Sequence, residues 1–273
     1  MKLGFIGMGN MAQALAGGFI AAKKVEPSNI YAFAPNQKKL LQNAESLGFT
    51  PVDSLKKLAS SEHIDIFVMA CKPYQIESVL AECGKDLLCA MQKGSSLVSV
   101  AAGWDYDAYE KAFSSYGKNP KVQFVMPNTP AMVGEGVFLF EKKNSLDADV
   151  RKTVEELFSS LGQVKELPSS LMGIGGAVTG CGPAFVDLFM EAYADAAVKY
   201  GISRADAYEL VAQTVLGSAA LCLKTGQHPA VLKDAVCSPN GTTICGVAAL
   251  EKEGFRNACI SSIDAIMLKK KCL

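Results

Sequence analysis

The chain has 273 residues, of which 49% are hydrophobic, and its 27 basic and 27 acidic residues leave a formal net charge of zero. This balance argues against a dedicated nucleic-acid-binding protein, because such proteins usually carry a basic excess. No run of about 18 apolar residues free of polar breaks is present, so we expect no membrane span. The length suits about two domains.

The nine cysteines form no C-x-x-C pair, and the two histidines cannot complete a Cys/His zinc site, so we expect no metal. Cysteines that are odd in number and scattered along the chain are typical of a reducing compartment. We therefore expect a cytoplasmic protein.

Apolar, β-rich runs alternate with segments of helical period from residue 1 to residue 167. The expected strands are Leu3–Ile6, Ile30–Phe33, Ile64–Ala70, Ser96–Ala101, Val122–Met126, Val137–Phe140 and Val164–Leu167. The expected helices include Met11–Ala22, Gln37–Leu47, Asp105–Phe113 and Ala148–Leu161. This alternation predicts an α/β domain over residues 1–167, with a mostly parallel sheet that becomes mixed where the later strands lack long helices between them.

After Pro168 the chain is glycine-rich and then almost entirely helical in pattern. One helix is expected to begin after Ser203, a good N-cap, and it is apolar nearly all the way round. A surface helix would not tolerate so much exposed apolar area. We therefore predict an all-α domain over residues 168–273 that forms a homodimer.

The opening stretch MKLGFIGMGNMAQALAGG supports two interpretations. A secretory signal peptide needs an uninterrupted apolar core, which Gly4, Gly7, Gly9 and Asn10 break. The alternative is a G-x-G-x-x-A turn that ends at Ala12, follows a strand and opens a helix whose N-terminus attracts a pyrophosphate. Because strand, turn and helix come in this order, we predict a dinucleotide-binding site.

The second expected strand indicates which dinucleotide is bound. Sites for NAD place an acidic residue at the end of this strand, but none occurs between Tyr31 and Lys39. Ala34, Asn36, Lys38 and Lys39 leave room and positive charge for a 2′-phosphate, although the lysines would equally suit a solvated helix. We predict NADPH, with NADH as the alternative.

Two further loops follow expected strands. Lys72 and Pro73 come after Ile64–Ala70, at the rim of the sheet where ligands bind, and Lys72 could contact the cofactor ribose. Asn128 and Thr129 lie in a loop stiffened by prolines, where they could present polar groups at a fixed position. Either loop could also be a simple turn.

A second candidate site is the SPNGTT string, in which Ser238 to Gly241 form a loop and Thr242 and Thr243 open a helix. Free backbone N–H groups, the helix dipole and the threonine hydroxyls suit a carboxylate. A well-capped helix explains the same local signals equally well. The cofactor site elsewhere in the chain favours the substrate interpretation.

The chain lacks an obvious strong proton donor, since His63 is expected in a loop and His228 precedes a proline. Ketone reduction creates an alkoxide that usually needs such a donor. A protonated imine already carries its charge, so neutral hydroxyl donors suffice. This absence favours reduction of a C=N bond.

The sequence resembles the pyrroline-5-carboxylate reductase family, which catalyses the last step of proline synthesis. The resemblance is carried, in order from residue 4 to residue 256, by GFIGMGNMA, CKPYQIESVL, VAAGW, MPNTPAMVGEG, AVTGCGPAFVDLFMEAYADAAVKYG and SPNGTTICGVAALEKEGFR. It implies a Rossmann domain, a helical domain that interlocks two subunits, and assembly that can extend to a decamer.

The resemblance also implies functional residues. The residues expected at the cofactor are Ile6, Gly7, Met8, Gly9, Asn10, Met11, Ala34, Asn36, Cys71, Lys72, Pro73, Ala102 and Asn128. The residues expected at the substrate are Ser238, Gly241, Thr242 and Thr243, with Thr243 as the hydrogen-bond donor to the ring nitrogen and hence the catalytic residue. A partner subunit would complete the pocket.

Four positions depart from the family pattern. Phe124 replaces a usual arginine, Cys181 a usual serine, Gly173 a usual acidic residue and Ala34 a common serine. These departures bear on cofactor preference and substrate affinity rather than on the reaction.

Rival interpretations remain at this point. A hydroxyacid dehydrogenase of similar architecture uses a lysine in a G-x-G-x-x-x-K frame, but the frame that begins at Gly180 ends in Val186. Another NADP-linked cyclic-imine reductase is a closer alternative. A non-catalytic NADP-binding regulator is the alternative from a different class, and the intact SPNGTT loop argues against it.

Overall fold

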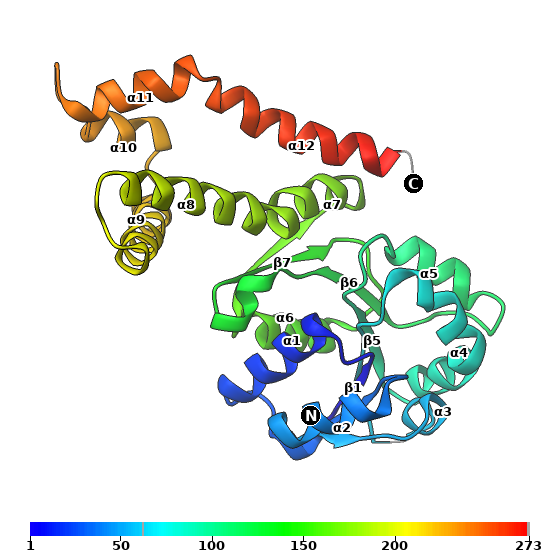
Figure 1. Cartoon of the computed structure of the whole chain (residues 1–273). Helices are drawn as coiled ribbons and strands as arrows, with labels where there is room; N and C mark the ends of the chain where they lie inside the picture. Colours follow the sequence, from blue (N-terminus) through cyan, green and yellow to red (C-terminus); the bar gives the residue numbers. More distant parts are fainter. Residues whose placement is uncertain (62, 272–273) are drawn as a thin grey trace. The chain divides into compact units, whose positions relative to one another are not determined.

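The computed structural model describes residues 1–61 and 63–271. The chain divides into two compact units, Met1–Gly180 and Cys181–Leu273, which we call unit 1 and unit 2. Unit 1 is the α/β part and unit 2 is helical, as the sequence predicts (Figure 1). The helix that follows residue 168 contacts the sheet, and the two compact units divide after Gly180, beyond the boundary after residue 167 that the sequence pattern predicts.

Unit 1 is built on one eight-stranded sheet with the order β3-β2-β1-β4-β5-β6-β7-β8. Its strands are β1 (Leu3–Ile6), β2 (Ile30–Phe33), β3 (Thr50–Pro51), β4 (Ile66–Met69), β5 (Ser96–Ser99), β6 (Val122–Met126), β7 (Gly136–Glu141) and β8 (Gly162–Leu167). All neighbours are parallel except β6 and β7, which are antiparallel. The prediction of a mostly parallel, partly mixed sheet is confirmed. The two-residue edge strand β3 was not predicted, because two residues are too few to show the alternating pattern of a strand.

Helices cover both faces of this sheet (Figure 1). The helices of unit 1 are α1 (Asn10–Ala21), α2 (Gln37–Leu47), α3 (Leu55–Ala59), α4 (Ile76–Gln92), α5 (Tyr106–Phe113), α6 (Ala148–Ser159) and α7 (Ser169–Gly176). Short 3₁₀ turns η1 (Pro27–Asn29), η2 (Pro73–Gln75) and η3 (Thr129–Val133) and the π turn η4 (Ala177–Cys181) complete the connections.

Two hydrophobic clusters fill the spaces between the sheet and its helices. One contains Phe19 and Phe158 and lies beneath α1 and α6, where the two rings meet edge to face at 5.5 Å. The other contains Phe67 and Phe113 and lies beneath α3, α4 and α5. The sheet is therefore buried on both faces, which explains why β1 and β4 are apolar throughout.

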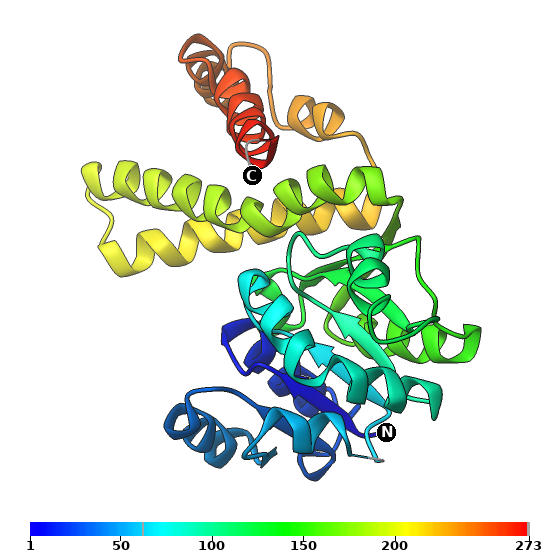
Figure 2. The same cartoon turned by 90° about the vertical axis from the view of Figure 1, so that its right-hand side faces the viewer.

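Unit 2 consists of α8 (Gly182–Lys199), α9 (Arg204–Thr225), α10 (Pro229–Ala235), α11 (Thr242–Lys252) and α12 (Phe255–Lys271). Helices α8 and α9 lie side by side (Figure 2). Ser203 caps α9 by accepting the backbone N–H of Asp206 at 3.2 Å, and Gly226 ends the helix in a left-handed conformation, as the sequence predicts.

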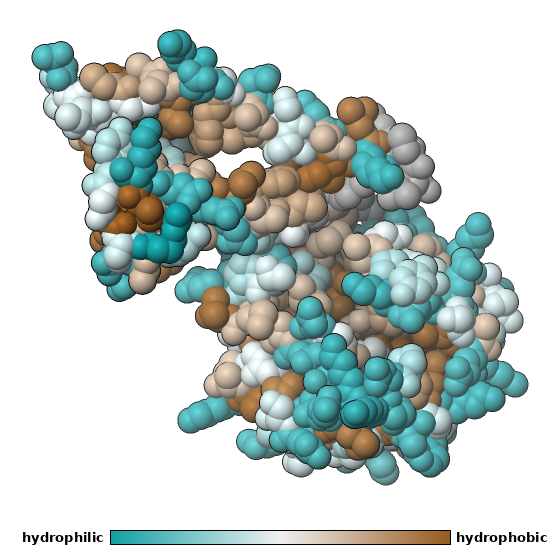
Figure 3. Space-filling view, viewed as in Figure 1, coloured by the Kyte–Doolittle hydropathy of each residue, from teal (hydrophilic) through white to brown (hydrophobic). Residues whose placement is uncertain are grey.

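The helices of unit 2 leave most of their apolar side chains exposed. From Cys181 to Lys269, the part of unit 2 whose burial the structure describes, only Ala194 and Ala207 are buried. Figure 3 shows apolar side chains at the surface along α8. Such an area normally marks a surface that another protein covers.

The helical run Ser169–Lys199 is long and apolar enough to cross a membrane by length and composition alone. The sequence predicts no membrane span because polar residues interrupt every long apolar run, and length and composition alone do not test that prediction.

Candidate active site

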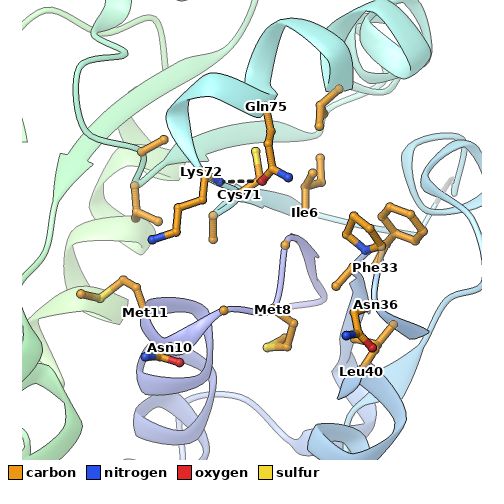
Figure 4. Close-up of a pocket in the computed structure, with 18 of the residues that line it drawn as sticks. Ile6, Met8, Asn10, Met11, Phe33, Asn36, Leu40, Cys71, Lys72 and Gln75 are labelled. Carbon is orange, nitrogen blue, oxygen red and sulfur yellow. Dashed lines mark hydrogen bonds between the residues drawn. The ribbon is translucent and has the colours of Figure 1, made fainter. Parts of the chain in front are cut away.

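A cavity of about 1010 Å³ opens in unit 1 at the carboxyl ends of β1, β2, β4 and β5. β1 lies between β2 and β4, so successive strands are added on one side of β1 first and then on the other. Doubly wound folds bind their ligands at the point where the strand order reverses in this way. Figure 4 shows Met8, Asn10 and Met11 on one wall, with Cys71 and Lys72 facing them. The predicted cofactor residues that line it are Ile6, Gly7, Met8, Gly9, Asn10, Met11, Ala34, Asn36, Cys71, Lys72, Pro73 and Ala102.

The glycine turn after β1 shapes one wall. Gly7 has a φ of +98°, and a Cβ there would approach the backbone nitrogen of Cys71 to 2.7 Å. Its own N–H donates to the carbonyl of Phe33 at 2.8 Å, so the turn is tied to the end of β2. A Cβ on Gly9 would meet no protein atom within 4 Å. Gly9 therefore faces open space that a ligand can fill.

The start of α1 supplies the anion-binding groups. Gly9 is the N-cap in an extended conformation, and no side chain caps the first turn. Free N–H groups and the positive end of the helix dipole are thus available at Gly9, Asn10 and Met11, all of which line the cavity. The open space beside Gly9 and these unpaired donors fit a pyrophosphate.

The end of β2 forms the wall expected to meet the adenosine ribose. Asn36 caps α2 by accepting the N–H of Lys39 at 3.0 Å. Gln37 fixes the preceding turn by donating its side-chain amide to the carbonyl of Ala34 at 2.8 Å. Of the two lysines considered from the sequence, Lys39 lines the cavity and Lys38 does not.

The ends of β4 and β5 form the wall furthest from β2. The backbone N–H of Lys72 donates to the side chain of Gln75 at 3.1 Å, which fixes the turn around Pro73 (Figure 4). Burial raises the pKa of the Cys71 thiol to about 11, so it is protonated at neutral pH. The uncharged Cys71 thiol and Pro73 give this wall an apolar part that suits a ring, and Lys72 beside them adds one positive charge.

Asn128 is the predicted cofactor residue that the structure does not bring to this cavity. Its side-chain amide donates to the carbonyl of Thr179 at 3.1 Å, and its oxygen accepts the N–H of Val137 at 2.8 Å. Both ends of the side chain are thereby used to join β7 and η4 within unit 1. The next residue, Thr129, does line the cavity, together with Met132.

Sequence reasoning missed several polar residues of the cavity wall, notably Asn43, Ser78 and Glu82. They lie inside α2 and α4 rather than at the strand ends. Helical periodicity gives the face of a helix that meets the core, but no local signal tells which part of that face meets a cavity.

The predicted substrate residues lie together in unit 2. Gly241 donates its N–H to the carbonyl of Ser238 at 3.0 Å, and Asn240 between them has a φ of +54°. Gly241 is the N-cap of α11 with no side-chain cap, and Thr242 and Thr243 are exposed in its first turn. A Cβ on Gly241 would collide with the hydroxyl oxygen of Ser238 as it now lies, so a larger residue would force the Ser238 side chain to turn.

The positions that depart from the family pattern have visible environments. Phe124 is 2% exposed and packs against Leu139 and Met172, so it replaces a cation with an apolar contact beneath α7. A Cβ on Gly173 would meet nothing within 4 Å. Cys181 is half-buried at the start of α8.

In the described residues, 1–61 and 63–271, no group of three or more His, Cys, Asp or Glu side chains is placed to hold a metal ion. The acidic residue Asp195, one of several on α8, instead pairs with Arg204.

Two family models match the chain. The first, described as "Pyrroline-5-carboxylate reductase dimerisation", matches residues 169–273, and the second, "NADP oxidoreductase coenzyme F420-dependent", matches residues 2–103. The matches fall on the helical part and on the strands and helices that form the cavity.

Curated relatives match over the whole chain. The pyrroline-5-carboxylate reductase of Treponema pallidum is 37% identical over 268 residues, which cover 98% of this chain and 99% of the relative. The pyrroline-5-carboxylate reductase of Escherichia coli is 38% identical over 272 residues, covering 100% and 98%.

Among solved structures, the Plasmodium falciparum pyrroline carboxylate reductase with NADP bound is 34% identical and superposes with a TM-score of 0.86, covering 100% of this chain and 97% of that one. The chain therefore belongs to the pyrroline-5-carboxylate reductase family.

Proposed function

We propose that the protein is a pyrroline-5-carboxylate reductase, which reduces the C=N bond of 1-pyrroline-5-carboxylate with NADPH to give L-proline. The observation that carries this proposal is that the chain matches curated reductases of this name from end to end. The residues of this chain that we expect at the cofactor, apart from Asn128, line one large cavity in unit 1.

NADPH is the cofactor of this reaction. The glycine turn and the first turn of α1 bind the pyrophosphate through backbone N–H groups. Asn36 and Lys39 lie where the 2′-phosphate belongs, at the end of β2, and the solved relative from Plasmodium falciparum holds NADP. Cys71, Lys72, Pro73 and Ala102 bind the ribose and ring at the other end.

The chemical step needs little from the protein beyond binding and orientation. When bound, the reduced nicotinamide supplies a hydride to the carbon of the C=N bond, and the nitrogen carries the proton that completes the amine. Gly241 and Thr242 hold the substrate carboxylate at the N-terminus of α11. Thr243 donates its hydroxyl to the lone pair that develops on the ring nitrogen as the C=N bond is reduced, and Ser238 fixes the conformation of the loop.

The protein acts as an oligomer through its helical part, which matches the dimerisation family over residues 169–273. We propose a homodimer that buries the exposed apolar side chains of unit 2, with further assembly to a decamer. We also propose that the working domains are 1–167 and 168–273, and that the enzyme is cytoplasmic.

The test is a turnover assay with the purified protein, 1-pyrroline-5-carboxylate and either NADPH or NADH, in which the product is identified by mass and chirality. We expect L-proline, formed faster with NADPH. If NADPH binds but no proline forms, the protein is either a reductase of another imine or a non-catalytic regulator, and a panel of cyclic and linear imines separates these two.

The role of Thr243 is tested with Thr243→Ala and Thr243→Ser in the same assay. Loss of the hydroxyl should lower kcat by roughly 100-fold, since a positioned hydrogen-bond donor at the reacting atom contributes about that much. Thr243→Ser keeps the hydroxyl and should retain most activity. Equal activity in all three proteins would show that Thr243 is not catalytic.

A further inference from the structure

The segment that joins β5 to α5 forms part of the cavity wall at the end remote from β2. Val100, Ala101 and Ala102 line the cavity, and this wall is where the nicotinamide belongs if the adenosine lies at β2. The backbone of this segment must be fixed, because hydride transfer depends steeply on the position of the ring.

Few hydrogen bonds fix this backbone. Val100 donates its N–H to the carbonyl of Met69 at 3.0 Å, which continues the β4–β5 ladder. The next N–H, that of Ala101, donates to a side chain, the hydroxyl oxygen of Ser99, at 3.3 Å. Beyond the sheet, the carbonyl of Ala101 accepts the N–H of Trp104 at 3.3 Å, so this wall is held by one backbone hydrogen bond and by the Ser99 hydroxyl.

The hydroxyl of Ser99 is itself held by a second buried group. The phenol oxygen of Tyr109, on α5, lies 2.8 Å from the Ser99 oxygen, and both residues are completely buried. The Tyr109 ring is clamped between Trp104 at 5.1 Å and Phe113 at 6.4 Å, measured between ring centroids. A rigid ring thus carries the hydroxyl that orients Ser99.

The Tyr109 phenol stays neutral. Burial raises its pKa by more than the hydrogen bond with Ser99 lowers it, so the oxygen keeps its proton at any physiological pH. Cys71, which lines the cavity at the end of β4, packs against the same hydrophobic cluster as Tyr109.

We propose that Tyr109 is a positioning residue for hydride transfer: through Ser99 it fixes the Ala101–Ala102 backbone against which the nicotinamide rests. The inference rests on the proposed function, because it assigns this wall to the nicotinamide. Tyr109 touches neither cofactor nor substrate, and its effect reaches the reaction through two hydrogen bonds.

The test compares two Tyr→Phe variants on the same helix. Tyr109→Phe removes the oxygen that holds Ser99 and keeps the ring between Trp104 and Phe113. Tyr106→Phe is the matched control, because the Tyr106 hydroxyl donates to Glu110 within α5 and does not reach the wall. Ser99→Ala removes the other member of the pair.

The measurements are kcat, KM for NADPH, the isotope effect on kcat with NADPH deuterated at the transferred position, and the melting midpoint. We expect Tyr109→Phe to lower kcat by about tenfold and to raise the isotope effect, because a misplaced ring slows the hydride step itself. KM for NADPH should change by less than about threefold, since the pyrophosphate and ribose contacts are untouched. Trp104, the only tryptophan of the chain, reports any change in the wall through its fluorescence.

Several outcomes decide the proposal. The double variant Ser99→Ala/Tyr109→Phe should be no slower than either single one, because the two hydroxyls act as one unit. A purely structural role would lower the melting midpoint and leave kcat per folded molecule and the isotope effect at wild-type values, which overturns the proposal. So does a kcat for Tyr106→Phe as low as that of Tyr109→Phe.

If Tyr109→Phe fails to fold, Ser99→Ala tests the positioning role instead, with the same measurements of kcat, KM for NADPH and the isotope effect. Failure of the proposed function is a separate result: the wild-type protein would then form no proline, while NADPH binding could still be followed through Trp104 in every variant.

Discussion

Unit 1 and unit 2 differ in how they bury their apolar residues. In unit 1, Phe5, Phe67 and Phe158 are almost completely buried between the sheet and its helices. In unit 2, Leu188, Leu216 and Leu223 are 64%, 56% and 76% exposed although their helices are equally regular. One unit has a core of its own, and the other has apolar helices with hardly any core.

This difference shows that the two units obey different constraints. The sheet of unit 1 is complete, so its sequence encodes both the fold and the cavity at the strand ends. The helices of unit 2 match a dimerisation family, and their apolar residues encode contacts that lie outside the single chain. Helices that are apolar on nearly every face would expose too much apolar surface in a monomer, but an oligomer can bury that surface between subunits.

The largest expected effect concerns the glycine turn of unit 1. It tests whether one glycine is needed for the stability of the fold and the other for cofactor binding. Gly7→Ala places a Cβ 2.7 Å from the Cys71 nitrogen at a φ of +98°. The free energy of unfolding should therefore fall by roughly 2–4 kcal/mol, the melting midpoint should fall with it, and NADPH turnover should be lost. Gly9→Ala meets no protein atom, so the midpoint should stay within about a degree while KM for NADPH rises about tenfold or more. Calorimetry and steady-state kinetics on both variants check this. Equal loss of stability in the two would show that Gly9 is structural.

The next prediction concerns the exposed surface of unit 2. Leu216→Asp, on α9, should weaken the dimer by about 100-fold or more, because a charge would enter an apolar interface. Leu41→Asp is the control, since Leu41 is 51% exposed on α2 of unit 1. Light scattering over a dilution series measures the change. A Leu216→Asp protein that stays as oligomeric as Leu41→Asp would show that this part of α9 lies outside the interface.

A smaller effect is expected for cofactor selectivity in unit 1. Lys39 lines the cavity at the end of β2, and Lys38 beside it does not. Lys39→Ala should raise KM for NADPH by about tenfold and leave KM for NADH nearly unchanged, since only the phosphorylated cofactor loses a charge-assisted contact. The matched Lys38→Ala should alter neither constant. If both variants behave alike, the preference for NADPH over NADH comes from the N-terminus of α2 as a whole and not from Lys39 alone.

The smallest expected effect comes from the buried carboxyl of Glu141, which accepts the N–H of Tyr106 at 2.8 Å at the start of α5. Burial raises the pKa of Glu141 above its usual 4.5, a hydrogen bond from Ser169 and that from Tyr106 lower it, and the charges of Asp105 and Asp107 raise it again. The folded protein therefore binds the proton more tightly than the unfolded chain, and stability falls as pH rises from below 4.5 through the folded-state pKa.

Glu141→Gln removes this dependence and keeps an acceptor for Tyr106. Relative to the wild type, its melting midpoint should therefore improve between about pH 4 and about pH 7. Melting curves over that range, with exposed Glu135→Gln as the control, provide the measurement. A difference between Glu141→Gln and the wild type that is flat with pH would contradict the assigned shift.

Local signals explain why much of unit 1 could be predicted from the sequence. The glycine turn, the strand before it and the helix after it are all set by residues near one another in the chain, and Gly7, Asn36 and Lys72 all line the cavity as expected. Asn128 shows the limit: its surroundings in the loop suggested a ligand contact, but its partners are Val137 and the distant Thr179.

Unit 2 could be predicted only in part, for a related reason. The cap at Ser203 and the loop before Thr242 depend on nearby residues and were identified. Which apolar faces of α8 and α9 meet another copy depends on residues of a second chain, and no period within one sequence encodes that pairing.

The most direct test of the central claim follows the hydride. NADPH deuterated at the transferred position is mixed with the protein and 1-pyrroline-5-carboxylate, and the product is analysed by mass spectrometry and NMR. The account predicts L-proline with one deuterium on the ring carbon that was double-bonded to nitrogen, at a rate that collapses in Thr243→Ala. Proline without deuterium, or NADPH binding without any proline, would contradict it.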